Sequence, residues 1–141
     1  MSRVVLLIFC LVAPLTGCVN EDAQCSEETI ISEGDYFYCY LGSYDGDVKI
    51  SWDYEQVSGS SNIDIYFMTS VNYQNYYQGN DFLYIIDISR ENTKSASLKE
   101  TSINLENNEY YIVWDHTTAG NAQPVAGDSV RIDVDFFIKA A

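Results

Sequence analysis

The last regular segment of the chain, residues 130–138, constrains the fold more strongly than any other stretch of the sequence. Its apolar and polar side chains alternate, and the apolar members are Val130, Ile132, Val134 and Phe136. Successive side chains of a β-strand point to opposite faces of a sheet. A period of two therefore predicts a strand with one face in the core and the other in solvent.

The same pattern recurs in short segments along the chain. It predicts strands over residues 35–41, 48–54, 63–67, 82–88 and 109–114, and a weaker, broken strand over 96–105. The segment 109–114 carries apolar residues on both faces, which predicts a central place in its sheet. With the final segment, these strands predict an all-β fold, an antiparallel β-sandwich of jelly-roll or immunoglobulin size with about seven or eight strands.

Clusters of turn-forming residues separate these segments. Residues 42–47 contain two glycines and two aspartates, and residues 58–62 are rich in serine. Such clusters are typical of tight connections between strands. Polar loops are expected over 90–92 and 117–127.

The first part of the chain has the features of an export signal. Arg3 precedes an apolar run over residues 4–12, which is too short to cross about 30 Å of hydrocarbon as a helix. The residues Leu-Thr-Gly-Cys at 15–18 resemble the lipobox of prokaryotic lipoproteins, whose cysteine is acylated and becomes the first mature residue. The resemblance implies lipidation of Cys18, export, and anchoring on the extracytoplasmic face of a membrane. The alternative is ordinary signal cleavage, with Thr16 and Cys18 as the small residues before the cut.

These boundaries predict three parts: a lipoprotein signal peptide over 1–17, an acidic tether over 18–28, and one β-sandwich domain over 29–141. A domain of this length is large enough for a single core. The chain contains 12 tyrosines, 6 phenylalanines and 2 tryptophans, which supply the apolar surface for it. Trp52 and Trp114 lie at positions whose alternation predicts burial.

The cysteines agree with export. Cys10 would leave with the signal and Cys18 would carry the lipid, so Cys25 and Cys39 remain. In an exported domain these two have only each other as partners, which predicts a disulfide. Closing a loop of about 15 residues contributes on the order of 3 kcal/mol in a chain-entropy treatment. The alternative is two buried thiols.

The charge of the chain limits its partners. There are 21 acidic and 7 basic side chains, for a net charge of −14. So few Lys and Arg residues cannot form a basic groove, which excludes nucleic acid as a partner. The lipid, rather than electrostatic attraction, would hold such a domain at an anionic membrane.

Few residues offer catalytic or metal-binding chemistry. His116 is the only histidine, and no serine lies in a Gly-x-Ser-x-Gly setting, so we expect His116 to make a structural hydrogen bond. We expect no enzyme, the alternative being a small hydrolase that uses paired carboxylates. No cofactor is expected apart from calcium, for which Asp45, Asp47 and Asp64 offer hard oxygen ligands. The alternative for these three residues is solvated turn acids.

A cluster of tyrosines is the candidate binding surface. Tyr73, Tyr76 and Tyr77 are spaced so that one helical turn would place them on the same face. With Tyr84 and Phe82 they offer a platform for a protein or a glycan, because tyrosine combines a large apolar face with a polar tip. The alternative is that these rings cap one open end of the sandwich core.

A family resemblance rests on residues 108–117, Asn-Glu-Tyr-Tyr-Ile-Val-Trp-Asp-His-Thr. This segment resembles the penultimate strand of GOLD-type (p24-like) sandwiches, which carries Tyr-x-Val-x-x-Asp-Asn-Thr before a final strand. It is also similar to the ending of pre-peptidase C-terminal domains, Gly-x-Tyr-Tyr-x-Val-x-Val. The chain differs from both in having His116 where asparagine is usual. The resemblance implies a sandwich with a non-catalytic binding or accessory role, and no active-site residue.

Two functions follow from these features. The first is a membrane-anchored lipoprotein whose sandwich is a binding or adhesion module for a protein or glycan. The second is an accessory structural lipoprotein of the cell envelope without a ligand of its own. An exposed aromatic patch favours the first, and complete burial of the rings favours the second.

Overall fold

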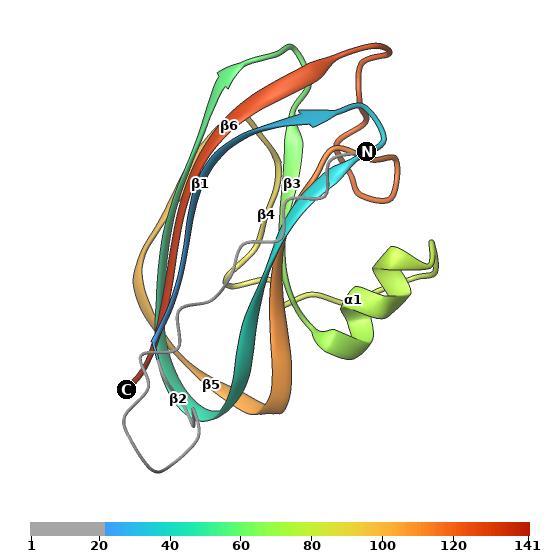
Figure 1. Ribbon diagram of the computed structural model, residues 1–141. Coiled ribbons are helices and arrows are strands. Elements are labelled where there is room, and N and C mark those ends of the chain that lie inside the picture. Colours follow the sequence, from blue (N-terminus) through green and yellow to red (C-terminus); the bar gives the residue numbers. More distant parts are fainter. Residues whose placement is uncertain (1–21) are drawn as a thin grey trace.

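The computed structural model of the protein describes residues 22–141, so the predicted signal peptide and Cys18 lie outside the described residues. The described residues form six strands and one helix: β1 (Ala23–Ser32), β2 (Tyr36–Ser58), β3 (Ile63–Thr69), α1 (Ser70–Tyr77), β4 (Arg90–Thr93), β5 (Ser95–Asp115) and β6 (Ser129–Ala140) (Figure 1). All strand pairs are antiparallel, in the order β1-β6-β2-β5-β3-β4. The predicted all-β class is confirmed.

Strands β2 and β5 are paired over most of their length and bend together in the middle. The register between them shifts near Gly42 and Gly46, whose φ angles are 96° and 107°. Glycine adopts these angles readily, and a β-bulge bends a strand without ending the ladder. Figure 1 shows both strands curving round the lower end of the molecule and returning upward.

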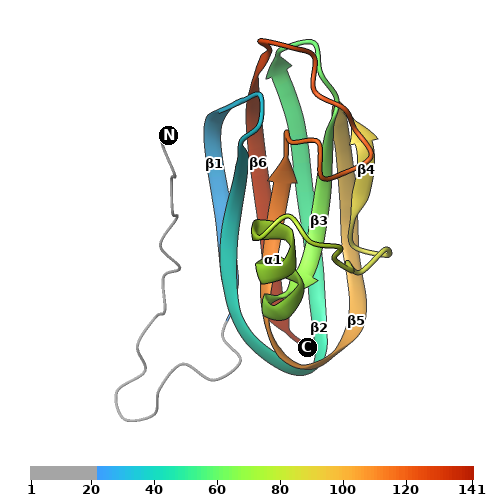
Figure 2. The ribbon, with the colours of Figure 1, turned by 90° about the vertical axis from the view of Figure 1, so that its right-hand side faces the viewer.

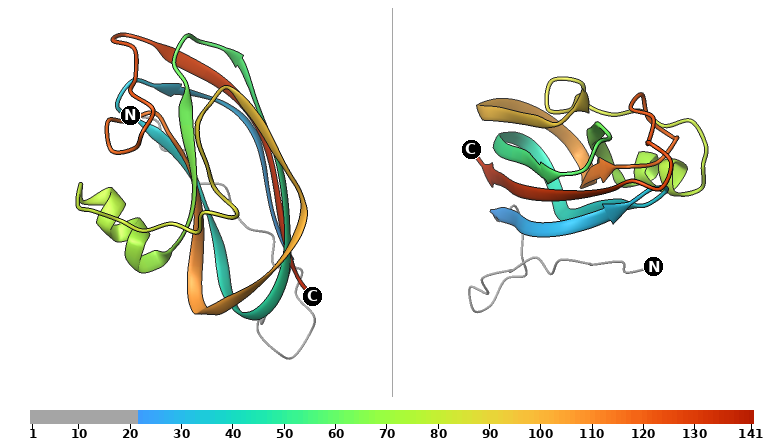
Figure 3. Two further views of the ribbon diagram at one scale, coloured as in Figure 1. Left: turned by 180° about the vertical axis from the view of Figure 1, so that it is seen from behind. Right: turned by 90° about the horizontal axis from the view of Figure 1, so that it is seen from above.

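The bend turns one sheet into two facing layers. One layer contains β1, β6, the second half of β2 and the first half of β5. The other contains the first half of β2, the second half of β5, β3 and β4 (Figure 3). The turn predicted over 42–47 is therefore wrong, because these residues lie inside one continuous strand. The segments 96–105 and 109–114 are likewise parts of β5, which is why six strands replace the seven or eight that were predicted.

Three other predicted boundaries differ from the structure. Residues 82–88 form a loop with a tight turn instead of a strand, and the predicted loop at 90–92 lies in β4. Burial does not follow the sequence alternation over 82–88: Phe82, Tyr84 and Ile85 are half-buried and Ile88 is fully buried, whereas Leu83 and Ile86 are exposed. Residues 23–28, predicted as tether, belong to β1 because they pair with β6.

The main core fills the space between the two layers. It contains the inward-facing residues of the strands, and the alternations predicted for 48–54 and 130–138 are confirmed. Phe67 of β3 stacks against Tyr110 of β5 and Phe136 of β6, with ring centroids 5.3 and 6.1 Å apart. Since Phe67 and Phe136 come from different layers, this stack joins them.

The disulfide between Cys25 and Cys39 is present. Cys25 lies in β1 and Cys39 in the first half of β2, so the bond connects the two layers. Both side chains are buried in the main core. The bond therefore ties edge strand β1 to the opposite layer.

A second apolar cluster lies on the outer face of the layer that contains β3. Helix α1 covers this face, as Figure 2 shows. The buried members of the cluster are Tyr66, Met68, Tyr73, Tyr76 and Val113. The end of β5 therefore has a core on each face, which confirms its predicted central place. Thr69 caps the helix by accepting a hydrogen bond from the N–H of Asn72 at 3.4 Å.

The two tryptophans are core residues, 2% and 1% exposed, and we expect Trp52→Ala and Trp114→Ala each to lower the free energy of unfolding by about 3–5 kcal/mol. They differ in hydrogen bonding. Nε1 of Trp52 donates to the carbonyl of Ile88 at 2.9 Å, whereas Nε1 of Trp114 has no hydrogen-bond partner among the described residues. Trp52→Phe should therefore cost about 1 kcal/mol more than Trp114→Phe in urea unfolding. A larger loss for Trp114→Phe would contradict this assignment.

Candidate binding site beside helix α1

A pocket of about 410 Å³ lies beside α1. Four segments form its walls: strand β3, the loop that follows α1, strand β4, and the loop between β5 and β6. The lining residues are Tyr66, Gly79, Asn80, Asp81, Phe82, Tyr84, Glu91, Ala119, Gly120 and Asn121. The loop after α1 is held in place because the N–H of Leu83 donates to Oδ1 of Asn72 at 2.8 Å, and the N–H of Ile85 donates to the carbonyl of Phe67 at 2.8 Å.

Aromatic rings in fixed positions form the apolar part of the pocket. Phe82 meets Tyr66 and Tyr76 edge to face, with ring centroids 5.1 and 5.2 Å apart. The ring of Tyr84 lies 4.6 Å from that of Tyr66. Aromatic pairs of this geometry contribute beyond their buried area, so the rings are held in position before any ligand arrives.

Glu91 is the central polar group of the pocket. Its Oε1 accepts hydrogen bonds from the hydroxyls of Tyr84 and Tyr66, the latter at 3.5 Å, and its Oε2 accepts one from Nδ2 of Asn121 at 2.5 Å. The hydrogen bond to Glu91, followed by burial, raises the pKa of Tyr84 to about 12. All three donors are neutral, so the charge of Glu91 is positioned but not balanced.

Two buried carboxylates lie behind the pocket wall. Asp64 of β3 and Asp115 of β5 face each other in register, and both are fully buried. A Cβ atom at Gly120 would lie 2.1 Å from Oδ2 of Asp64 and 2.9 Å from Oδ2 of Asp115. Only glycine fits there, so the loop between β5 and β6 crosses directly over the acid pair. The backbone N–H groups of Asn92 and Ala122 donate to Asp64 at 2.8 and 2.9 Å.

The two oxygens of Asp115 have different surroundings. Oδ1 accepts hydrogen bonds from the hydroxyls of Tyr76 and Thr117, the latter at 2.6 Å. Oδ2 has no hydrogen-bond partner among the described residues. Burial, with a smaller contribution from the charge of Asp64, raises the pKa of Asp115 to about 6. Burial also raises the pKa of Asp64.

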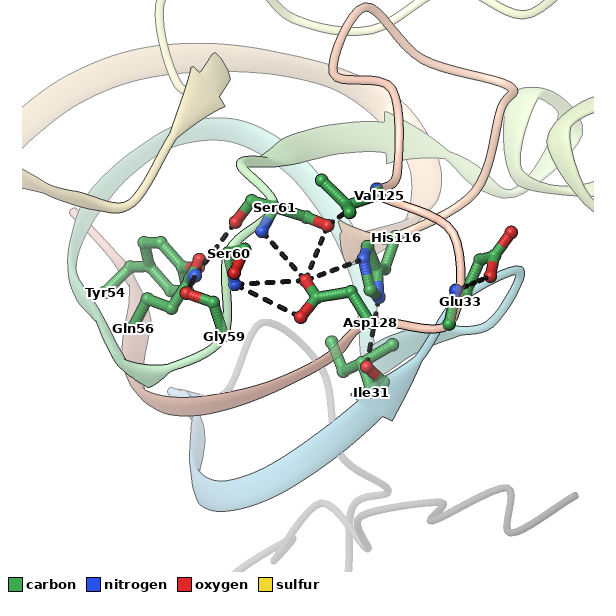
Figure 4. A network of polar contacts seen from close by, with 11 residues as sticks. Ile31, Glu33, Tyr54, Gln56, Gly59, Ser60, Ser61, His116, Val125 and Asp128 are labelled. Atoms are coloured by element: carbon green, nitrogen blue, oxygen red, sulfur yellow. Dashed lines mark hydrogen bonds and ion pairs between the residues drawn. The ribbon is translucent and has the colours of Figure 1, made fainter.

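His116 belongs to a separate polar network at one end of the sandwich (Figure 4). Its Nδ1 lies 3.0 Å from the carbonyl oxygen of Ile31, and its Nε2 lies 3.9 Å from Oδ2 of Asp128. The Ser61 hydroxyl and N–H and the Ser60 N–H donate to Asp128, and these bonds, the hydroxyl first, lower its pKa to about 2. His116 therefore makes the predicted structural hydrogen bond. Through Asp128 it also connects β1 to the loop between β2 and β3 and to the loop between β5 and β6.

The structure divides the predicted tyrosine patch. Tyr73 and Tyr76 lie on the side of α1 that packs against the sheet and are buried there. The ring of Tyr73 stacks on that of Tyr111, with centroids 4.0 Å apart. Tyr77 is 47% exposed and does not line the pocket. Only Tyr84 of the four is a pocket residue. The spacing of Tyr73, Tyr76 and Tyr77 predicts a helical turn but does not show which side of the helix meets the sheet.

The three aspartates proposed for calcium do not form one site. Asp45 and Asp47 lie at the bend of β2, where Asn104 donates a hydrogen bond to Asp47 at 2.8 Å. Asp64 pairs with Asp115 at the other end of β5. Within residues 22–141, no group of three or more acidic, histidine or cysteine side chains is placed to hold a metal ion.

Glu91 and Asn121 were not identified from the sequence, because both lie in segments that resemble ordinary polar loops.

In comparisons with known proteins, no family model and no curated protein matches the chain. Among the described residues, no helix is both long enough and apolar enough to span a membrane.

We expect Asp115→Asn to stabilise the protein at pH 8, by on the order of 1–3 kcal/mol. The folded-state pKa of about 6 lies above the ordinary 3.8, so protonation of Asp115 favours the fold. The stabilisation that protonated Asp115 gives to the fold is complete below about pH 4 and is lost as the pH rises through 6. Urea unfolding at pH 4.5 and pH 8 should show the variant gaining over the wild type only at the higher pH.

Asp128→Asn is the control, because the pKa of Asp128 is lowered instead of raised. Its ionised form stabilises the fold above the ordinary pKa, so the variant should lose stability at pH 8. A difference between Asp115→Asn and the wild type that is the same at both pH values would contradict the assignment.

Proposed function

We propose that this protein is an exported lipoprotein, anchored through lipid on Cys18, whose sandwich is a non-catalytic binding module for a protein or glycan. The pocket beside α1 would be the binding site. The observation that supports this most directly is the combination of aromatic rings held in fixed positions with one hydrogen-bonded carboxylate, Glu91. Concave sites with apolar walls and a few convergent polar groups are typical of ligand pockets.

The position of the pocket suits presentation away from a membrane. Ala23, at the start of β1, pairs with Ile138 near the end of β6. The loop that carries Gly120 instead precedes Ser129, at the start of β6. The chain between the anchor and the domain would therefore join it roughly 30 Å along β6 from the pocket loop.

Two further features support export and a non-catalytic role. The disulfide between Cys25 and Cys39 favours an oxidising compartment. The segment 108–117 ends the penultimate strand, β5, as it would in the GOLD-type sandwiches that it resembles.

A second candidate is an accessory structural lipoprotein without a ligand. The burial of Tyr73 and Tyr76 favours it, because these rings serve as packing under α1. Under this proposal the pocket would be a surface depression with no partner.

The lipid anchor is tested by mass spectrometry of the membrane fraction, which should find a diacyl or triacyl group on Cys18. Cys18→Ala should move the protein to the soluble fraction, because no lipid would then hold it. A mature N-terminus at another residue, without lipid, would refute the anchor.

Glycan and peptide arrays test the binding module with the full-chain protein. Tyr84→Ser should abolish binding of the array ligands while changing the melting temperature little, because Tyr84 is only half-buried. Tyr73→Ser should instead destabilise the fold by about 3 kcal/mol, since it removes a buried ring. Array binding that is unaffected by Tyr84→Ser, or no array binding at all, would favour the structural alternative.

A further inference from the structure

We infer that the pocket beside α1 binds an organic cation, the ammonium or guanidinium group of a lysine or arginine side chain. The inference rests on the proposed binding function and specifies its ligand. It is carried by the chemistry of the pocket wall: carboxylates without a balancing cation, beside aromatic rings that are already ordered.

The charge of the pocket is negative and unbalanced. Asp81 and Glu91 line it, and no lysine or arginine does. The ion pairs among the described residues involve other acids, Glu28, Glu100 and Asp128, so neither pocket carboxylate has a cationic partner within residues 22–141. A cationic group entering the pocket would supply the missing charge, whereas an anionic ligand would be repelled.

The donors around Glu91 hold its carboxylate in place. Tyr84 and Tyr66 donate to one oxygen and Asn121 to the other. A carboxylate offers about four lone-pair sites, so an ammonium or guanidinium group can be accepted without breaking these bonds. The ligand therefore meets a group that is already oriented, which lowers the cost of ordering it.

The rings add an attraction that is specific for cations. Phe82, Tyr84 and Tyr66 present aromatic surface within the same pocket as Glu91. The faces of such rings attract ammonium and guanidinium groups. The chain already uses this contact elsewhere, since the guanidinium carbon of Arg90 lies 5.9 Å from the centre of the Trp52 ring.

The buried acid pair behind Gly120, Asp64 and Asp115, also favours a cation in the pocket. Oδ2 of Asp115 is fully buried, has no partner among the described residues, and lies where a Cβ atom on Gly120, a pocket-lining residue, would be 2.9 Å away. Asp64 lies beside it and is likewise not paired with a cation. Charges in a poorly solvated wall act over longer distances than charges in water, so Asp115, once ionised, strengthens the negative potential in the pocket.

Calorimetric titration of the full-chain protein at neutral pH and low salt tests the inference. The probes are Nα-acetyl-arginine amide and an arginine-containing peptide, each compared with its citrulline counterpart, which has nearly the same shape but no charge. Arginine should bind at least about tenfold more tightly than citrulline. Binding of the peptide alone would place the cation in a protein partner, and binding of both would show that the side chain suffices.

Two matched variants locate the site. Glu91→Gln keeps the shape of the side chain and removes its charge, and should weaken arginine binding about tenfold or more. Glu109→Gln is the control, because Glu109 accepts a hydrogen bond from Tyr40 as Glu91 does from Tyr84, away from the pocket. If Glu91→Gln lowers the melting temperature, Asp81→Asn at the exposed rim replaces it and should also weaken binding.

The outcomes separate this inference from the proposed function. Equal binding of arginine and citrulline probes, or equal effects of Glu91→Gln and Glu109→Gln, would overturn the inference. If a neutral glycan or peptide binds and Tyr84→Ser abolishes that binding while arginine shows none, the binding function stands and the cationic ligand is wrong. If neither the arginine probes nor any array ligand binds, both proposals fail.

Discussion

The shared bend of β2 and β5 is the feature on which the rest of the structure depends. Because the two strands stay paired across the register shifts at Gly42 and Gly46, one antiparallel sheet folds over and faces itself. The main core, the stack of Phe67 on Phe136, and the disulfide from Cys25 to β2 all exist only because the two halves meet. A turn at the same place would have given two separate hairpin strands, without the continuous ladder that connects one layer to the other.

The second half of β5 has a core on each of its faces, and the pocket beside α1 adjoins the outer one. On that side, tyrosines of the sheet and of α1 pack together, with Tyr73 lying flat on Tyr111. Such rings combine apolar contact with hydroxyl groups, which suits a layer that is covered on one side and wet at its edge. At that edge the packing continues into Phe82 and Tyr84, and here Glu91 and the loop of Gly120 complete the pocket.

The acidic side chains of this protein fall into two groups with different physical roles. Most of the 21 acidic side chains contribute to solubility through the net charge of −14. Asp64 and Asp115 differ from these because both are fully buried, where ionisation is costly, and the loop over Gly120 leaves no space between them and the pocket wall. Burial raises the pKa of Asp115 to about 6. Once this carboxylate ionises, little solvent lies between its charge and the pocket.

The sequence by itself determined the all-β class, the inward faces of the strands, the burial of Trp52 and Trp114, and the disulfide. Alternation is a local pattern, and the number of cysteines left Cys25 and Cys39 with only each other as partners. The tertiary structure decided which segments are continuous. Residues 42–47 have turn composition, yet pairing with β5 keeps them in a strand. It also decided that Tyr73 and Tyr76 face the sheet, and that Glu91 meets Asn121 across the fold. Contacts between such distant segments depend on how the layers close, which no local pattern records.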